Sequence, residues 1–165
     1  MLLACALVAG CSSDEPSPLE EAQATPTVTA PAEDPEAEVL ATWEAYWDAI
    51  VASEGSADPE DPALDRLRSV AAPALAERQV GIVRRYAGYG LVRTGEPAFR
   101  DEEVTVDGDT ATVTACFSED DWEAERNGET VPSEDRGFVP VGAQLERRDD
   151  GWIVVSDDAP EDVTC

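Results

Sequence analysis

The stretch formed by residues 103–118 limits the fold more than any other part of the chain, because it has the pattern of two strands joined by a tight turn. Val104 and Val106 alternate with polar residues before the turn, and alanine and valine alternate with threonine after it. The turn itself is Asp107-Gly108. A period of two on both sides of an Asp-Gly pair is the strongest short-range signal for a β-hairpin. We therefore expect an antiparallel sheet in this half of the chain.

Helical patterns precede the hairpin. Asp34 suits the N-cap of a helix, and Pro35 suits its first turn. The apolar residues that follow recur every three or four positions and share one face, which predicts an amphipathic helix. These residues are Val39, Leu40, Trp43, Tyr46, Trp47, Ile50 and Val51. We expect the helix to end near Ser53, with Gly55 as its C-cap.

Two shorter helices and further strands complete the pattern. Asp61-Pro62 repeats the cap-and-proline start, and Pro73 either breaks this second helix or begins a third. Alternating or apolar runs bounded by turn residues then predict strands in addition to the hairpin, at residues 91–99, 138–147 and 152–156. Helices in the first half and antiparallel strands in the second half are typical of the α+β class, which is the fold class we predict.

The first residues have the pattern of an export signal. The apolar run over residues 2–9 is far too short to span a bilayer, but it fits the hydrophobic region of a signal peptide. Its end, Val8-Ala9-Gly10-Cys11, resembles the bacterial lipobox. The resemblance implies cleavage before Cys11 and a diacylglyceryl group on its thiol, which would anchor the protein to the extracytoplasmic face of the cell membrane. A frayed apolar N-terminus of a cytosolic protein is the alternative.

These features divide the chain into a signal peptide (1–10), a disordered tether (11–34) and a folded domain (35–165). The tether is rich in Pro, Thr and acidic residues and has almost no large apolar side chain, so it cannot bury enough surface to fold. The whole chain carries 37 acidic and 11 basic residues, a formal net charge of -26. Such a charge repels phosphates and excludes nucleic acid. The expected partners are the membrane, through the lipid anchor, and an unknown envelope protein or small ligand.

The order of elements resembles the NTF2-like superfamily, in particular the small exported lipoproteins of actinobacteria that carry such a domain after an acidic tether. The resemblance covers about residues 34–165 and rests on patterns, not on catalytic signatures. The matching features are the first helix with Trp43 and Trp47, the hairpin at 104–116, the Asp150-Gly151-Trp152 turn and Cys165. The resemblance implies N-terminal helices packed on a curved antiparallel sheet. Together they form a cone that some members use as a pocket.

The cysteines fit this interpretation. Cys5 leaves with the signal peptide and Cys11 carries the lipid, so one pair remains in an oxidising compartment, where disulfides persist. We expect Cys116 and Cys165 to form a disulfide; two free thiols are the alternative. Two cysteines without any histidine cannot complete a zinc site, and the acidic residues 119–121 lack the spacing of a calcium loop. We therefore expect no metal.

The sequence offers little for catalysis. It has no histidine and no glycine-rich phosphate loop, which excludes Ser-His and Cys-His triads. Trp43, Tyr46 and Trp47 are candidates to line a pocket, although aromatic residues at helical spacing also suit a core. The steroid-isomerase type of this superfamily uses an Asp base and a Tyr; Tyr46 is the nearest match for the Tyr, and no Asp matches. We therefore assign no catalytic residue.

The predicted function is a non-catalytic binding or accessory domain without a cofactor. An isomerase-like or hydrolase-like enzyme that uses the cone is one alternative, and a structural module of the cell envelope is another. The interior of the cone discriminates between them. A closed apolar cone without a buried acid favours the non-enzymatic functions, whereas a buried Asp beside Tyr46 in an open pocket favours the enzyme.

Overall fold

The computed structural model describes residues 34–134, 136–159 and 163–165. Within these ranges three helices precede seven strands. They are α1 (Pro35–Ser56), α2 (Pro62–Val70), α3 (Pro73–Tyr89), β1 (Leu91–Gly95), β2 (Ala98–Asp107), β3 (Thr110–Ser118), β4 (Trp122–Arg126), β5 (Glu129–Val131), β6 (Val139–Arg148) and β7 (Gly151–Ser156). The expected signal peptide, the lipidation site at Cys11 and the tether up to residue 33 lie outside the described residues.

All three helices begin at a proline, which suits the first turn because its missing N–H would have no partner there. The Asp34 carboxylate accepts a hydrogen bond from the Glu36 N–H at 3.1 Å, and Asp61 accepts one from the Ala63 N–H at 2.7 Å. The two predicted N-caps are thereby confirmed. Pro73 begins a third helix.

The predicted end of the first helix is wrong. α1 continues to Ser56, and Ala57 forms the C-cap with a left-handed φ of 48°. Gly55 lies inside the last turn, where a Cβ atom would stand 3.4 Å from the carbonyl oxygen of Arg93 in β1. Gly55 therefore lies within the helix beside β1 and does not act as the cap. The additional turn places Glu54 in the protein interior.

The predicted hairpin is confirmed, and the predicted strand before it is two strands. β2 and β3 are antiparallel around Gly108. The segment expected to be one strand breaks at Gly95, which has a φ of 78°, and β2 starts after Pro97. A Cβ atom at Gly95 would lie 2.0 Å from the carbonyl oxygen of Asp121, so only glycine fits where β1 passes the turn before β4. The break carries the chain from one sheet to the other.

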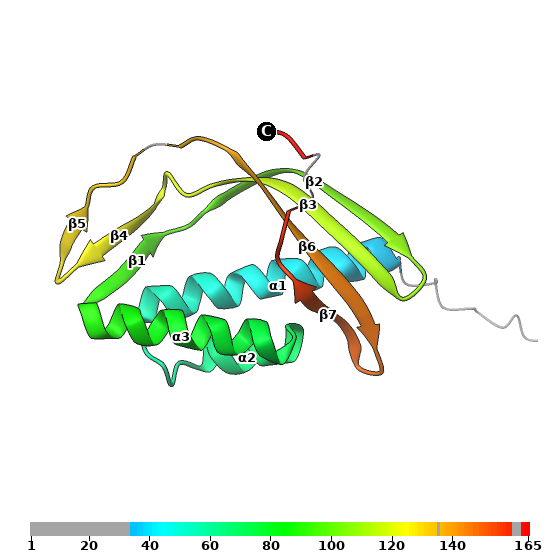
Figure 1. Cartoon of the computed structure of the whole chain (residues 1–165), viewed down its shortest axis with the longest axis horizontal. Coiled ribbons are helices and arrows are strands. Elements are labelled where there is room, and N and C mark those ends of the chain that lie inside the picture. Colours follow the sequence, from blue (N-terminus) through cyan, green and yellow to red (C-terminus); the bar gives the residue numbers. More distant parts are fainter. Residues whose placement is uncertain (1–33, 135, 160–162) are drawn as a thin grey trace, which may run out of the picture. The chain divides into compact units, whose positions relative to one another are not determined.

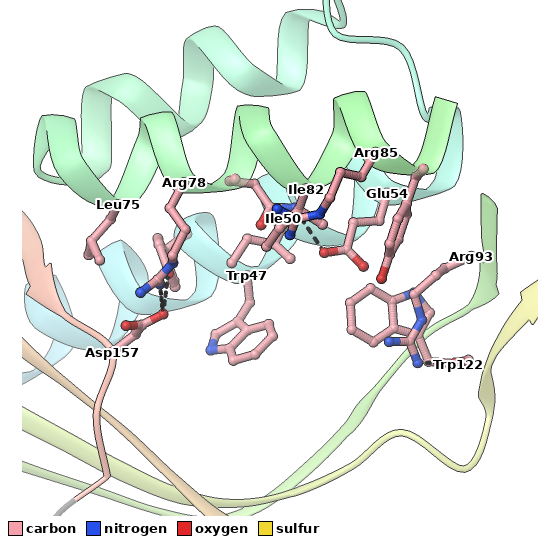
Figure 2. A pocket seen from close by; sticks show the side chains of 13 residues that line it. Trp47, Ile50, Glu54, Leu75, Arg78, Ile82, Arg85, Arg93, Trp122 and Asp157 are labelled. Carbon is pink, nitrogen blue, oxygen red and sulfur yellow. Dashed lines mark hydrogen bonds and ion pairs between the residues drawn. The ribbon is translucent and has the colours of Figure 1, made fainter. Parts of the chain in front are cut away.

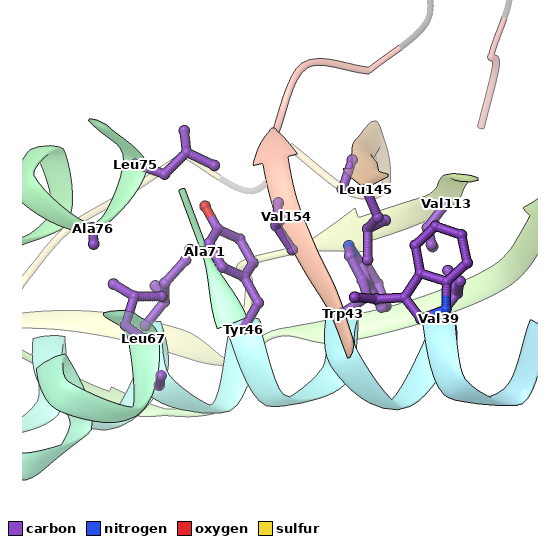
Figure 3. Close-up of a cluster of buried hydrophobic side chains, with 14 of the residues drawn as sticks. Val39, Trp43, Tyr46, Leu67, Ala71, Leu75, Ala76, Val113, Leu145 and Val154 are labelled. Carbon is purple, nitrogen blue, oxygen red and sulfur yellow. The ribbon is translucent and has the colours of Figure 1, made fainter. Parts of the chain in front are cut away.

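The strands form two antiparallel sheets, β1-β4-β5 and β2-β3-β6-β7, and the helices lie against the inner side of the curved strands (Figure 1). The inward face of β3 is formed by Ala111, Val113 and Ala115, each at most 5% exposed. Figure 3 shows the core between Trp43 of α1, Leu67 of α2 and Val154 of β7. The predicted α+β class is confirmed, and the arrangement is consistent with an NTF2-like cone.

Two connections fix the ends of the sheet to the rest of the domain. The N–H of Ala72, between α2 and α3, donates to the carbonyl of Val154 in β7 at 2.7 Å. The expected disulfide joins Cys116 of β3 to Cys165, with Cα atoms 5.7 Å apart. Among the described helices, none has both the length and the apolar character that crossing a membrane requires.

Candidate ligand-binding site

A cavity of about 340 Å³ opens between α1, α3 and the strands β1 and β4 (Figure 2). Its lining comes from these four elements and from the segment after β7. The lining residues are Tyr46, Trp47, Ile50, Glu54, Leu75, Arg78, Gln79, Ile82, Arg85, Tyr86, Arg93, Trp122 and Asp157. Its volume lies near the lower end of the range of about 300–1,000 Å³ that is usual for ligand pockets.

The three aromatic residues proposed for a pocket are divided between the cavity and the core. Tyr46 and Trp47 line the cavity. Trp43 is 2% exposed and packs edge-on against Phe99, with ring centroids 4.9 Å apart. Trp47 also stacks on Phe117 at 5.3 Å, so one of its faces belongs to an aromatic cluster under the sheet.

Asp157, at one end of the cavity, has two partners on one carboxylate oxygen. The Tyr46 hydroxyl donates to Asp157 Oδ2 at 3.2 Å, and the Arg78 guanidinium pairs with the same oxygen. Burial, with the negative charge of Asp157 beside it, raises the pKa of Tyr46 well above its ordinary value. Tyr46 therefore stays protonated as the donor to Asp157. Oδ2 of Asp157 is therefore satisfied by residues of the protein itself.

Glu54, at the other end of the cavity, is only partly engaged. Its residue is 5% exposed, and Gln79 Nε2 donates to Oε1 at 2.9 Å. Oε2 is buried and has no hydrogen-bond partner among the described residues. Burial raises the pKa of Glu54, and the opposing effects of Gln79, Arg93 and the nearby Tyr86 hydroxyl are smaller. A buried acceptor without a partner costs free energy, so Oε2 is the group most in need of a ligand.

Arg93 supports the same end of the cavity. Its guanidinium lies 3.7 Å from the centroid of the Trp122 ring and binds Glu119 Oε2 at 3.1 Å. It also donates to the carbonyl of Trp122. Nε of Arg93 and Nε1 of Trp122 are buried without a partner among the described residues. One acceptor and two donors are thus left open around this part of the cavity.

A second hollow, of about 510 Å³, lies against a different part of Trp47. It is lined by Trp47, Asp48, Val51, Ala52, Glu96, Pro97 and Phe99. Its charged residues, Asp48 and Glu96, are exposed and therefore solvated by water. No buried polar atom of its described lining lacks a hydrogen-bond partner. The first cavity, which contains Glu54 and is called the Glu54 cavity below, is therefore the better candidate site.

Glu54 was missed at the level of sequence because the first helix was expected to end at Ser53. The signal was present, since Glu54 follows Ile50 by four positions and continues the apolar face of the helix. Its partners Gln79 and Arg93 come from other elements, and no local pattern connects them. Within the described part of the chain, no group of three His, Cys, Asp or Glu residues is arranged to hold a metal ion. Glu119, one of the acidic residues 119–121 considered above for calcium, forms an ion pair with Arg93.

No protein-family model matches the chain, and no curated protein matches its sequence. Among solved structures, an NTF2-like family protein from Streptomyces avermitilis aligns with 17% identity over 78% of this chain and 96% of its own, with a TM-score of 0.49. An NTF2-like protein of unknown function from Shewanella oneidensis aligns with 13% identity over 76% and 98%, with a TM-score of 0.47. The intermembrane space region of the chloroplast protein ARC6 aligns with 15% identity over 79% and 100%, also at 0.47.

The arrangement of three helices against two antiparallel sheets is consistent with an NTF2-like cone. Structural similarity at such low identity transfers no activity, ligand or partner. The functional argument for this domain therefore rests on its own cavity.

Proposed function

We propose that this protein is an extracytoplasmic lipoprotein, anchored to the cell membrane through Cys11, whose NTF2-like domain binds a small molecule in the Glu54 cavity. The observation that carries the proposal is the buried Oε2 of Glu54, which has no partner among the described residues. A domain without a ligand bears the cost of this acceptor, whereas a bound donor removes it. Binding without reaction is sufficient to explain this arrangement.

The binding function can be tested with a fragment library and two matched variants of α3. Ile82 lines the cavity, and Ile82→Trp should fill it; Arg84 is exposed on the same helix and outside the cavity. Fragments that raise the melting temperature of the native domain should lose this effect with Ile82→Trp and keep it with Arg84→Trp. Fragments that act equally on all three proteins would contradict a cavity ligand.

The anchor requires a separate experiment in cells. Cys11→Ala should prevent lipidation and move the protein from the membrane fraction to an unprocessed or soluble form. Cys5→Ala is the matched control, because it removes a cysteine from the expected signal peptide and leaves Cys11 in place. Native protein found in the cytosol with Met1 intact would refute the anchor.

A second candidate function is an isomerase-like or hydrolase-like enzyme. The specific observation in its favour is that burial raises the pKa of Glu54, which suits a general base better than an exposed carboxylate does. Turnover of a small carbonyl or epoxide compound by the purified domain, abolished by Glu54→Gln, would establish the enzyme. Binding of the same compounds without turnover supports the binding domain.

A further inference from the structure

We propose that the cavity selects small uncharged molecules with a hydroxyl or N–H donor on an apolar body, and that Glu54 Oε2 accepts the hydrogen bond of this donor. The inference rests on the proposed binding function and specifies its ligand class. Three features of the cavity support it: the orientation of the Glu54 carboxylate, the balance of charge around it and the nature of the walls.

The orientation of Glu54 leaves one acceptor for a ligand. Gln79 Nε2 holds Oε1 at 2.9 Å and also lies 3.3 Å from the Ser53 hydroxyl, so the carboxylate is fixed from one side. Oε2 is then the remaining oxygen, and it is buried. An ionised carboxylate can only accept hydrogen bonds, which means that the complementary ligand group is a donor.

The charges around Glu54 disfavour a charged ligand. Arg93 lies near enough to lower the pKa of Glu54, and a cationic ligand would meet this guanidinium as well as the carboxylate. An anionic ligand would meet Glu54 itself, and Arg85, the third arginine of the lining, is exposed and solvated by water. At the other end, the charges of Arg78 and Asp157 compensate each other. A neutral donor satisfies Oε2 without adding a charge that the site must desolvate.

The walls suit an apolar body of limited size. Trp47, Ile50, Leu75, Ile82 and Trp122 contribute apolar surface to the cavity. Figure 2 shows Trp47 and Trp122 with their rings on the side of the cavity opposite α3. Flat aromatic surfaces of this kind contact rings and short aliphatic chains through apolar area. The volume of about 340 Å³ restricts the ligand to a small molecule.

The test compares four benzyl or benzoyl probes near neutral pH, with dissociation constants measured by NMR titration. Benzyl alcohol carries a neutral donor, benzyl methyl ether lacks it, benzylamine is a cation and benzoate is an anion. We expect benzyl alcohol to bind about tenfold more tightly than the ether, the size of one hydrogen bond to a charged acceptor. Equal binding of alcohol and ether, tightest binding of benzylamine or benzoate, or no binding of any probe would overturn the proposal.

Glu54→Gln makes the test more specific because it replaces a hydrogen-bond acceptor in the cavity by a donor. Gln79 should keep the new amide oxygen at the place of Oε1, so that an NH₂ donor replaces Oε2. The preference of the site should then turn toward the ether, whereas Glu44→Gln, at an exposed position of α1 outside the cavity, should leave the preference unchanged. An unchanged preference with Glu54→Gln would overturn the proposal, and the comparison of probes on the native protein does not depend on how this variant folds.

Failure of this experiment is distinguishable from failure of the binding function. Fragments that bind the native domain but not Ile82→Trp would still identify the cavity as a ligand site, even if the proposed preference for a hydrogen-bond donor (the donor rule) proved wrong. The donor rule is supported only by the joint result of the alcohol preference and its reversal in Glu54→Gln.

Discussion

The two carboxylates of the cavity have opposite environments. Asp157 has a side chain that is 27% exposed, and both Tyr46 and Arg78 bind it. Glu54 is 5% exposed and is held through one oxygen only, by Gln79. The more deeply buried acid therefore has fewer partners, which is the reverse of what stability alone favours. The comparison identifies Asp157 as a structural link and Glu54 as the group available to a ligand.

The largest effect should come from the disulfide, which joins β3 to Cys165, a residue that follows Asp157 in the same C-terminal segment. Cys116 and Cys165 are separated by 49 positions, and loss of a bridge that closes such a loop lowers the free energy of unfolding by about 2–4 kcal/mol. The double variant Cys116→Ser, Cys165→Ser should show this loss in urea unfolding. NMR shifts should change more at Tyr46 and Asp157 than at Glu54. Native protein with reductant is the control, and an unchanged urea midpoint would refute the structural role of the bridge.

The next effect should come from removing the hydrogen bond between Gln79 and Glu54. Gln79→Leu takes the donor away from Oε1 of this buried carboxylate, keeps the nearby Tyr86 hydroxyl and should cost about 1–3 kcal/mol. Combining it with Glu54→Leu should recover most of this loss, because both polar groups are then absent. Thermal unfolding of the single and double variants measures the difference. A double variant less stable than Gln79→Leu alone would contradict the partner relationship.

A smaller loss of unfolding free energy is expected at the Asp157 end of the cavity. Tyr46→Phe removes the hydroxyl that donates to Asp157 and should cost about 0.5–1.5 kcal/mol, since Asp157 keeps Arg78. Chemical denaturation gives the value. A loss of stability larger than that of Gln79→Leu would contradict this order, because the contacts of Asp157 would then contribute more to stability than those of Glu54.

The smallest effect concerns pH. Burial raises the pKa of Glu54, so the folded protein holds this proton more tightly than the unfolded chain does. The stability contributed by that proton is present below the ordinary Glu pKa and is lost as the pH rises through the raised value. Glu54→Gln should flatten this decline, and Glu44→Gln, at an exposed position of the same helix, should keep it. The same pH slope in both variants would show that Glu54 does not titrate in this way.

The sequence predicted the elements better than the site. Alternation around Asp107-Gly108 and the caps at Asp34 and Asp61 are local patterns, and the structure has the corresponding hairpin and helix starts. The break at Gly95 was missed because it depends on the carbonyl of Asp121, which only the fold brings near.

The site depends even more on distant contacts. Trp43 and Tyr46 share a helix face and both are buried, but the hydroxyl of Tyr46 reaches Asp157 at the wall of the cavity, whereas Trp43 packs on Phe99. The burial of Glu54 follows from α1, α3 and β1 together, which no short stretch of sequence encodes. The disulfide was predictable for a different reason, since counting the cysteines left one pair.

The cavity also connects residues from nearly the whole length of the domain, since Tyr46 and Asp157 meet across 111 positions. A site of this kind exists only when the first helix and the last strand have both assembled. A ligand at a hundred times its dissociation constant would therefore stabilise the entire fold by about 2.7 kcal/mol, more than the loss expected from Tyr46→Phe. The supply of such a ligand would then set how often the chain opens to proteases, and the abundance of the protein would follow the abundance of the ligand.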